Sequence, residues 1–114
     1  MADPDCLFCK IVAGEIPADI VDRTERVIAF RDLNPQAPTH VLVVPVEHYA
    51  NIGEAGREGG DVVGEMAVVA DRVGLAADPD GWRWVFNTGR RAGQVVFHVH
   101  GHVLAGRDLT WPPG

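Results

Sequence analysis

The chain has 114 residues, enough for one domain with a single core; 46% of them are hydrophobic and 23% are charged. No apolar run approaches the roughly 20 residues of a membrane span, so a membrane protein is not expected. Ten basic and sixteen acidic residues give a net charge of −6, and no basic stripe is present, so a nucleic acid is not expected as a partner.

The N-terminal segment, Met-Ala-Asp-Pro-Asp, lacks the basic region and the apolar core of a signal peptide, which makes a cytoplasmic protein the default prediction. The apolar run that follows, to about Gly14, is compatible with a helix and contains Cys6-Leu-Phe-Cys9. Residues three apart share a helix face, so both thiols can bind one metal ion. Two buried apolar side chains and a redox pair are the alternatives for this short motif.

Two short strands are expected over residues 20–22 and 26–31, joined as an antiparallel hairpin. Asp32 follows directly, and two prolines make the next stretch irregular. An acidic residue at a strand end can accept both hydroxyls of a ribose, or it can bond its own backbone in a turn. Residues 40–45 form a near-continuous apolar strand, which predicts a central position buried on both faces.

Residues 53–60 contain four glycines and alternating charges, and they are expected to form a flexible surface loop. Asp61 is expected to cap the next helix, and Gly74 to end it. The apolar stripe of this helix predicts a face that packs in the core: Val62, Met66, Val69 and Val73. Residues 82–87 predict a strand in which one face is aromatic and the other carries Arg83, Val85 and Asn87.

Residues 93–107 contain three of the five histidines, at positions 98, 100 and 102. In an extended strand alternate side chains share a face, so the three imidazoles are expected in one row. They can bind a catalytic zinc with one open position, or one can act as a nucleophile or acid/base that its neighbours orient. A solvated strand face without chemistry is the third alternative. The glycine-bearing loop over 87–94 can cradle an oxyanion with its backbone N–H groups, which favours phosphoryl or nucleotidyl chemistry.

The run His98-Val-His-Gly-His-Val-Leu104 resembles the His-φ-His-φ-His-φ-φ signature of the histidine triad (HIT) nucleotide-binding family. Residues 32–45 and the terminal Trp111-Pro-Pro-Gly114 resemble its Hint branch, and the similarity extends from residue 6 to residue 114. It implies one α+β HIT domain over residues 1–114, with about five strands in a mainly antiparallel sheet, two helices and a sheet continued across a homodimer. In Hint proteins the terminal tail reaches the partner subunit's site; packing of this tail onto a neighbouring element is the alternative.

The resemblance implies a hydrolase of purine nucleoside 5′-phosphoramidates or related nucleotidyl esters and anhydrides, with no cofactor needed for catalysis. His100 would attack the α-phosphorus and form a covalent nucleotidyl-histidine, held in orientation by the backbone carbonyl of His98. His102 would stabilise the charge that develops, and His40 would support the triad. The residues implied to bind the purine nucleotide (AMP, GMP or a derivative) are Asp32, Leu33, Asn87, Gly93, Gln94, Val95, Phe8, Ile11 and Phe30. A diadenosine polyphosphate hydrolase and a nucleotide-binding interaction module with little turnover are the alternatives.

The resemblance also adds His48 and His98 to Cys6 and Cys9 as the ligands of a structural zinc, a donor set that suits tetrahedral Zn²⁺. Two positions depart from the family pattern. Val95 stands where the family usually has a hydroxyl residue; valine cannot relay a proton, which puts a general-acid contribution of about 10²–10⁴ at risk and leaves the preferred leaving group open. Gly101 stands where an apolar side chain is usual, which predicts a slightly weaker strand and free space on the core face.

Overall fold

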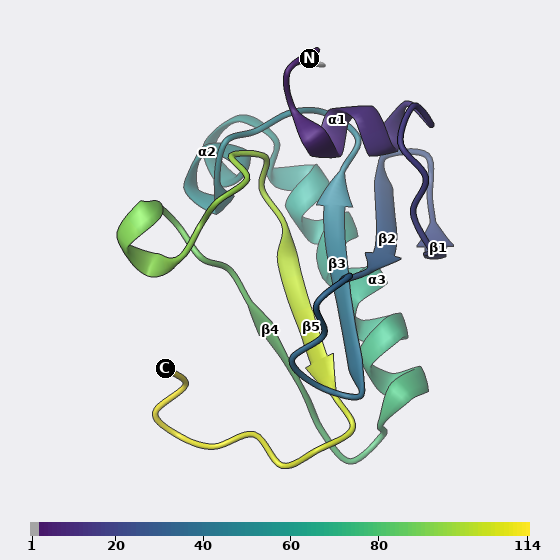
Figure 1. The fold of residues 1–114 in the computed structure, drawn as a ribbon, viewed down its shortest axis with the longest axis vertical. Helices are drawn as coiled ribbons and strands as arrows, with labels where there is room; N and C mark the ends of the chain where they lie inside the picture. The colour runs from purple at the N-terminus through teal and green to yellow at the C-terminus, as the bar shows by residue number, and fades with distance from the viewer. Residues whose placement is uncertain (1–2) are drawn as a thin grey trace.

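The computed structural model describes residues 3–114, so Met1 and Ala2 of the N-terminal segment lie outside the described residues. Five strands form one antiparallel sheet in the order β1-β2-β3-β5-β4. Their bounds are β1 (Ile20–Arg23), β2 (Val27–Arg31), β3 (Thr39–Pro45), β4 (Trp82–Val85) and β5 (Gly101–Ala105). The predicted α+β fold is confirmed, and β3 is central, as its apolar run predicts (Figure 1).

Three α-helices and one short 3₁₀ helix accompany the sheet: α1 (Leu7–Val12), α2 (Ile52–Glu58), α3 (Gly60–Ala77) and η1 (Arg90–Ala92). In Figure 1, α3 lies behind the sheet and α1 lies at its upper end. The predicted stripe of α3 is confirmed as core, because Val62, Met66 and Val69 pack against the side chains of β2, β3 and β5. Phe8 and Ile11 of α1 pack on the opposite face of the sheet, against Ile28, Phe30, Leu42 and Val44. Within residues 3–114, no helix is long and apolar enough to cross a bilayer.

The prediction of a flexible loop over residues 53–60 is wrong, because α2 occupies most of that stretch. The side-chain oxygen of Asn51 accepts a hydrogen bond of 2.9 Å from the backbone N–H of Glu54 and caps the helix. Ala55 is completely buried beside Tyr49 and Val99. Tertiary packing thus outweighs the low helix propensity of the glycines.

The predicted ends of the long helix are also wrong. α3 begins at Gly60, and its N-cap residue, Gly59, makes no side-chain capping bond, so Asp61 lies in the first turn instead. The helix continues through Gly74 to Ala77. A Cβ on Gly74 would lie 2.2 Å from Cδ2 of Trp82, so this glycine makes room for the indole ring rather than ending the helix.

Only part of the segment expected to be an extended histidine strand is a strand, because β5 begins at Gly101. The pairing of β5 with β3 stops at Gly101 and Val43. Pro45 ends β3, and its carbonyl oxygen lies 2.8 Å from Nε2 of His98, so a ring N–H takes the place of a ladder bond there. His98 and His100 therefore precede the strand, and only His102 lies within it.

The strand expected over residues 82–87 is observed as β4, and its aromatic face is confirmed, since Trp82, Trp84 and Phe86 pack against the core under α3. The alternating side chains, including Arg83 and Val85, lie on the other face of the sheet. Trp111 is 82% exposed, so its indole ring does not pack closely onto its own chain. Figure 1 shows the C-terminal tail turning back below β4 and β5.

Candidate active site and metal cluster

A cavity of about 300 Å³ opens between α1, β2 and the segment that leads to His98. His100 and His102 line it together with seven of the nine residues expected to bind a nucleotide: Phe8, Ile11, Phe30, Asp32, Leu33, Gly93 and Val95. Leu33 is fully exposed and Val95 is 84% exposed, so these two form the rim rather than the walls. The fold thus brings the aromatic residues of α1 and β2 to the histidines.

Asn87 and Gln94 are absent from the lining of this cavity. Gln94 is 2% exposed, and its side chain accepts from the N–H of Gly89 at 2.9 Å and donates to the carbonyl of Ala50 at 2.7 Å. Its side chain therefore links the glycine loop to the backbone at Ala50. The backbone N–H groups of Gly93 and Gln94 donate to carbonyls within this loop, whereas that of Val95 has no hydrogen bond within residues 3–114. Of these three backbone N–H groups, that of Val95 is the one left free to donate.

Asp32 makes the turn contact considered for it and also lines the cavity. Its Oδ1 accepts from the backbone N–H of Asn34 at 2.7 Å, as a turn aspartate does. Its Oδ2 lies 3.5 Å from Nε2 of His40, and the carboxylate still lines the cavity. One oxygen is therefore used in the turn, and the other faces the histidines.

His100 presents an unprotonated nitrogen to the cavity. Its Nδ1 lies 2.8 Å from the carbonyl oxygen of His98, and because a carbonyl can only accept, Nδ1 carries the proton. Burial lowers the pKa of His100 below its ordinary value, although the same hydrogen bond opposes the shift. A neutral imidazole protonated on Nδ1 has its lone pair on Nε2. The ring stands edge-on to Phe8, with centroids 4.9 Å apart.

His102 has the opposite tautomer, and His40 sets it. The backbone N–H of Gln36 donates to Nδ1 of His40 at 3.0 Å, so the proton of neutral His40 is on Nε2. That Nε2 lies 2.8 Å from Nδ1 of His102 and donates to it, which leaves the proton of His102 on its own Nε2. Burial, with smaller effects of His100 and His40, lowers the pKa of His102 to about 4, so the ring is neutral near pH 7.

Nε2 of His102 is buried and has no hydrogen-bond partner within the described part of the chain. A buried N–H without an acceptor is costly, so an acceptor is expected from a bound ligand. The rings of His100 and His102 lie 5.0 Å apart between centroids. The cavity is thus lined by two adjacent imidazoles, one offering a lone pair and the other a proton.

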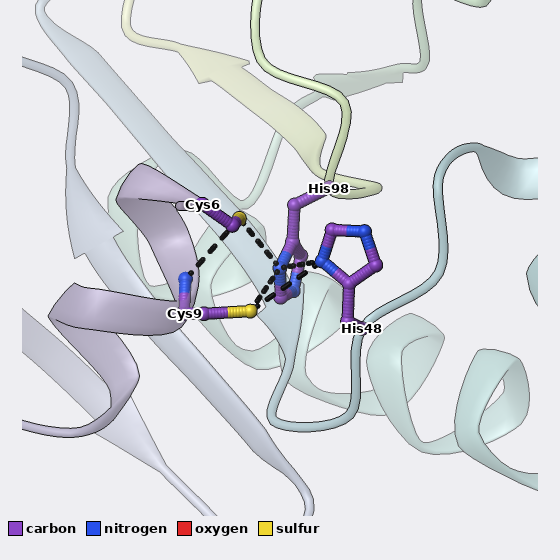
Figure 2. Close-up of side chains that lie close together, drawn as sticks. All are labelled: Cys6, Cys9, His48 and His98. Atoms are coloured by element: carbon purple, nitrogen blue, oxygen red, sulfur yellow. Dashed lines mark hydrogen bonds between the residues drawn. The ribbon is translucent and has the colours of Figure 1, made fainter. Parts of the chain in front are cut away.

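A second cluster of side chains is formed by Cys6, Cys9, His48 and His98, which converge on one another (Figure 2). Sγ of Cys9 lies 3.4 Å from Nδ1 of His48 and 3.4 Å from Nδ1 of His98. The two Nδ1 atoms are 3.2 Å apart, and Sγ of Cys6 is 3.4 Å from Nδ1 of His98. Ligands on one tetrahedral Zn²⁺ would be about 3.5 Å apart for sulfur and nitrogen and about 3.3 Å for two nitrogens. The distances between the ligand atoms therefore match the edge lengths of a tetrahedral zinc site.

The tautomer of His98 also suits a metal. Its Nε2 donates to the carbonyl of Pro45, so its Nδ1 lone pair points toward the cysteines. A hydrogen bond from the second nitrogen to a carbonyl is the usual support of a metal-bound histidine. Burial raises the pKa of the Cys9 thiol, which opposes thiolate formation when no cation is bound. A bound cation would favour the thiolate form instead.

His98, His100 and His102 do not form a metal-ligand group within residues 3–114, so the arrangement expected for a three-histidine zinc is not observed there. Asp32, His40 and His102 do lie close enough to form one. Their nitrogens are 2.8 Å apart, which is the distance of an N–H···N hydrogen bond and shorter than the spacing of about 3.3 Å on zinc. This group is therefore better described as a proton-holding pair with a carboxylate beside it.

The HIT domain family model matches residues 13–109. The chain belongs to the HIT family. A HIT family hydrolase from Legionella pneumophila Philadelphia 1 is 43% identical with a TM-score of 0.91, covering 96% of this chain and all of the other. A histidine triad nucleotide-binding protein from Candida albicans is 31% identical with a TM-score of 0.81, covering 95% of this chain and 83% of that one. The 14 kDa zinc-binding protein of Zea mays is 41% identical over 118 residues, covering 98% of this chain and 90% of the maize protein.

Three residues near His40 and His102 were not expected from the sequence: Gln36, which donates to His40, and Arg83 and Arg107, which line a second cavity beside the two histidines. Gln36 acts through its backbone N–H, and no side-chain pattern reveals where a loop amide will point. The alternation of residues 82–87 puts Arg83 on the non-aromatic face, which is a usable signal. Only the register of β4 against β5, with Val85 opposite His102, brings that face to the histidines.

Proposed function

We propose that this HIT protein hydrolyses nucleotidyl compounds, above all purine nucleoside 5′-phosphoramidates, through a covalent nucleotidyl-His100 intermediate. The observation that carries the proposal is the pair of opposite tautomers, a lone pair on Nε2 of His100 beside a proton on Nε2 of His102. Hydrolase and nucleotide-binding relatives support the same class of reaction.

In the first step Nε2 of His100 forms a bond to the α-phosphorus, and the bond from phosphorus to the leaving group breaks. The electron pair goes to the leaving atom, which takes up a proton from solvent water. Nε2–H of His102 and the N–H of Val95 donate to the phosphoryl oxygens as their charge increases. Water then attacks the phosphorus and gives up a proton to solvent. The bond from phosphorus to Nε2 of His100 breaks, the nucleoside monophosphate departs, and His100 recovers its lone pair. Two easier displacements replace one difficult displacement.

The nucleoside is expected in the apolar part of the cavity. Phe8, Ile11 and Phe30 offer apolar surface to a purine base, and Asp32 lies where its Oδ2 can accept from a ribose hydroxyl. Asn87 and Gln94 do not line that part; Gln94 acts by holding the loop. Leu33 covers the base only from the rim.

Cys6, Cys9, His48 and His98 would hold a structural Zn²⁺, as their spacing and the zinc-binding relative suggest. The metal would tie α1 to the segment before β5 and would need no part in bond cleavage. A homodimer is proposed as well, because β4 forms an open edge of the sheet and Trp111 is exposed. A cytoplasmic location is part of the same proposal.

The proposal is tested by intact-protein mass spectrometry after mixing with adenosine 5′-phosphoramidate, for wild type, His100→Ala and His100→Asn. A transient mass gain of one AMP in the wild type alone, followed by release of AMP, is expected. Activity should persist with a chelator present. Nucleotide binding with neither adduct nor product would instead favour the alternative of a binding module. The missing hydroxyl at Val95 would then explain the lack of turnover.

A further inference from the structure

A second cavity, of about 320 Å³, adjoins the histidines next to the nucleotide cavity. His102 borders both cavities, so its Nε2–H lies at their junction. The polar residues around the second cavity are Gln36, His40, Arg83, Asn87, His102, Arg107 and Thr110. No Asp or Glu is among its lining residues. In a protein with sixteen acidic residues and a net charge of −6, this cavity is locally positive.

The charge comes from Arg83 and Arg107. In the register of β4 and β5, Val85 lies opposite His102 and Arg83 lies opposite Leu104, so Arg83 is the diagonal neighbour of His102 on the same face. Arg107 donates from Nε to the carbonyl of Gln36 at 3.1 Å, the residue whose N–H fixes the tautomer of His40. Both guanidinium groups are thereby held near the histidine pair.

Neither arginine has a carboxylate within 4.0 Å in the described residues, whereas Arg26, Arg31 and Arg72 each have one. Arg83 donates to the carbonyl of Leu109 at 3.4 Å, and Arg107 donates to the carbonyls of Gln36 and Asp108. Both also border a neighbouring groove that contains Asp78, Asp80 and Asp108, yet no ion pair joins them to these carboxylates. Their positive charges are therefore left for another anion.

We propose that the second cavity binds an anionic group of the leaving group, so that the preferred substrates are nucleotidyl compounds whose leaving group carries a carboxylate or a further phosphate. The inference rests on the proposed function and specifies its substrate class. Guanidinium groups bind both anions through paired N–H donors, and Asn87 can add a further hydrogen bond. The anionic group takes no part in bond cleavage. It holds the leaving group in a fixed position relative to Nε2 of His100, which favours displacement at phosphorus.

The test compares two substrates that differ by one charge: the adenosine 5′-phosphoramidate of glycine and that of glycinamide. We expect wild type to favour the glycine compound by about 10- to 100-fold in kcat/KM, the range of a charged hydrogen bond. Arg83→Gln and Arg107→Gln should each reduce that ratio about tenfold. Arg57→Gln, an exposed arginine on α2, is the matched control and should keep the wild-type ratio.

A binding measurement tests whether the second cavity recognises a further phosphate, and it needs no turnover. Calorimetry would compare AMP with adenosine 5′-(α,β-methylene)diphosphate, which carries a second phosphate on a bridge that resists hydrolysis. Tighter binding of the diphosphate, lost in Arg83→Gln and Arg107→Gln but kept in Arg57→Gln, supports the subsite even if neither substrate is cleaved. Preference for glycine alone or for the diphosphate alone identifies which anion is recognised.

The two proposals fail in different ways. Equal kcat/KM for both phosphoramidates and equal affinity for both nucleotides, unaffected by the arginine variants, would overturn the subsite and leave the hydrolase intact. Tighter diphosphate binding without cleavage of any compound would overturn the hydrolase and support the subsite. Absence of both cleavage and binding would overturn both.

Discussion

Nδ1 of His100 donates a hydrogen bond of 2.8 Å to the backbone carbonyl of His98, while the ring of His98 lies among Cys6, Cys9 and His48. One residue therefore belongs to both constellations. Its side chain belongs to the metal cluster, and its carbonyl sets the tautomer of the proposed nucleophile. Any change in the position of His98 is expected to affect the two together.

Removal of zinc is expected to reduce stability first and activity second. If free Zn²⁺ exceeds its Kd by about 1,000-fold, binding contributes about 4 kcal/mol to the free energy of unfolding, which a chelator would remove. Urea unfolding with and without chelator measures this loss in wild type. Cys9→Ser should show a smaller response to chelator, because one thiolate ligand is gone. An identical response in wild type and Cys9→Ser would exclude the cluster as the source of the effect.

Acid is expected to destabilise the fold partly through His102. Its pKa is about 4 in the folded chain and 6.5 in the absence of burial. Above pH 6.5 both states hold the ring neutral; between 6.5 and 4 the unfolded state binds the proton and the folded state does not, so stability falls as the pH falls. The full loss is at most about 3 kcal/mol.

Urea unfolding at pH 7 and pH 4.5 would measure that loss, with His102→Asn as the comparison. The variant lacks the titrating ring, so its stability should fall less on acidification than that of wild type. The difference between the two changes isolates His102 from the other acid-sensitive groups. Equal changes would show that the ring titrates alike in both states.

Val95→Ser is expected to accelerate turnover of phosphoramidates. Val95 lies on the rim of the cavity and is 84% exposed, so the exchange should alter the free energy of unfolding by less than about 0.5 kcal/mol. A hydroxyl there can donate to the leaving group, and a gain in kcat/KM of up to about 10²-fold is expected. Val95→Ala is the control, since it removes the isopropyl group and adds no donor. If the serine and alanine variants were equally active, proton supply from this position would have no role.

Gly101→Ala is expected to destabilise the core face of the sheet. The space predicted at this glycine is filled, because a Cβ there would lie 2.0 Å from Nε1 of Trp84 and 2.7 Å from Cζ of Phe86. Overpacking of this kind costs about 1–3 kcal/mol. In a Trp84→Leu background the same substitution should cost clearly less, which thermal or urea unfolding of the four proteins measures as a coupling energy. An equal cost in both backgrounds would show that the indole ring is not the obstacle.

Much of the fold could be predicted from local pattern. The strand over 40–45 is almost continuously apolar because β3 is covered on both faces. The stripe of α3 repeats because only one side of that helix meets the sheet. The prediction of a loop over residues 53–60 was wrong because local pattern does not report contacts with distant parts of the chain. Glycine content describes the intrinsic preference of a segment, while the burial of Ala55 and the cap at Asn51 depend on contacts elsewhere in the chain.

The sequence by itself determined which kinds of side chain are available at the site. They are two cysteines at helical spacing and three histidines two residues apart, with a glycine loop before the histidines. It also supported membership of the family, which the family model bears out. Spacing along the chain fixes which side chains are available and which face of an element they share.

Only the tertiary structure decided what each histidine does. His98, His100 and His102 are equivalent in the sequence pattern, yet one donates to the carbonyl of Pro45, one to the carbonyl of His98, and one accepts from His40. Pro45 and His40 lie in β3, and the carbonyl of His98 lies in the segment before β5. An imidazole has two nitrogens and one proton when neutral, so its partner, which long-range packing supplies, determines whether it binds a metal, attacks a phosphorus or donates a proton.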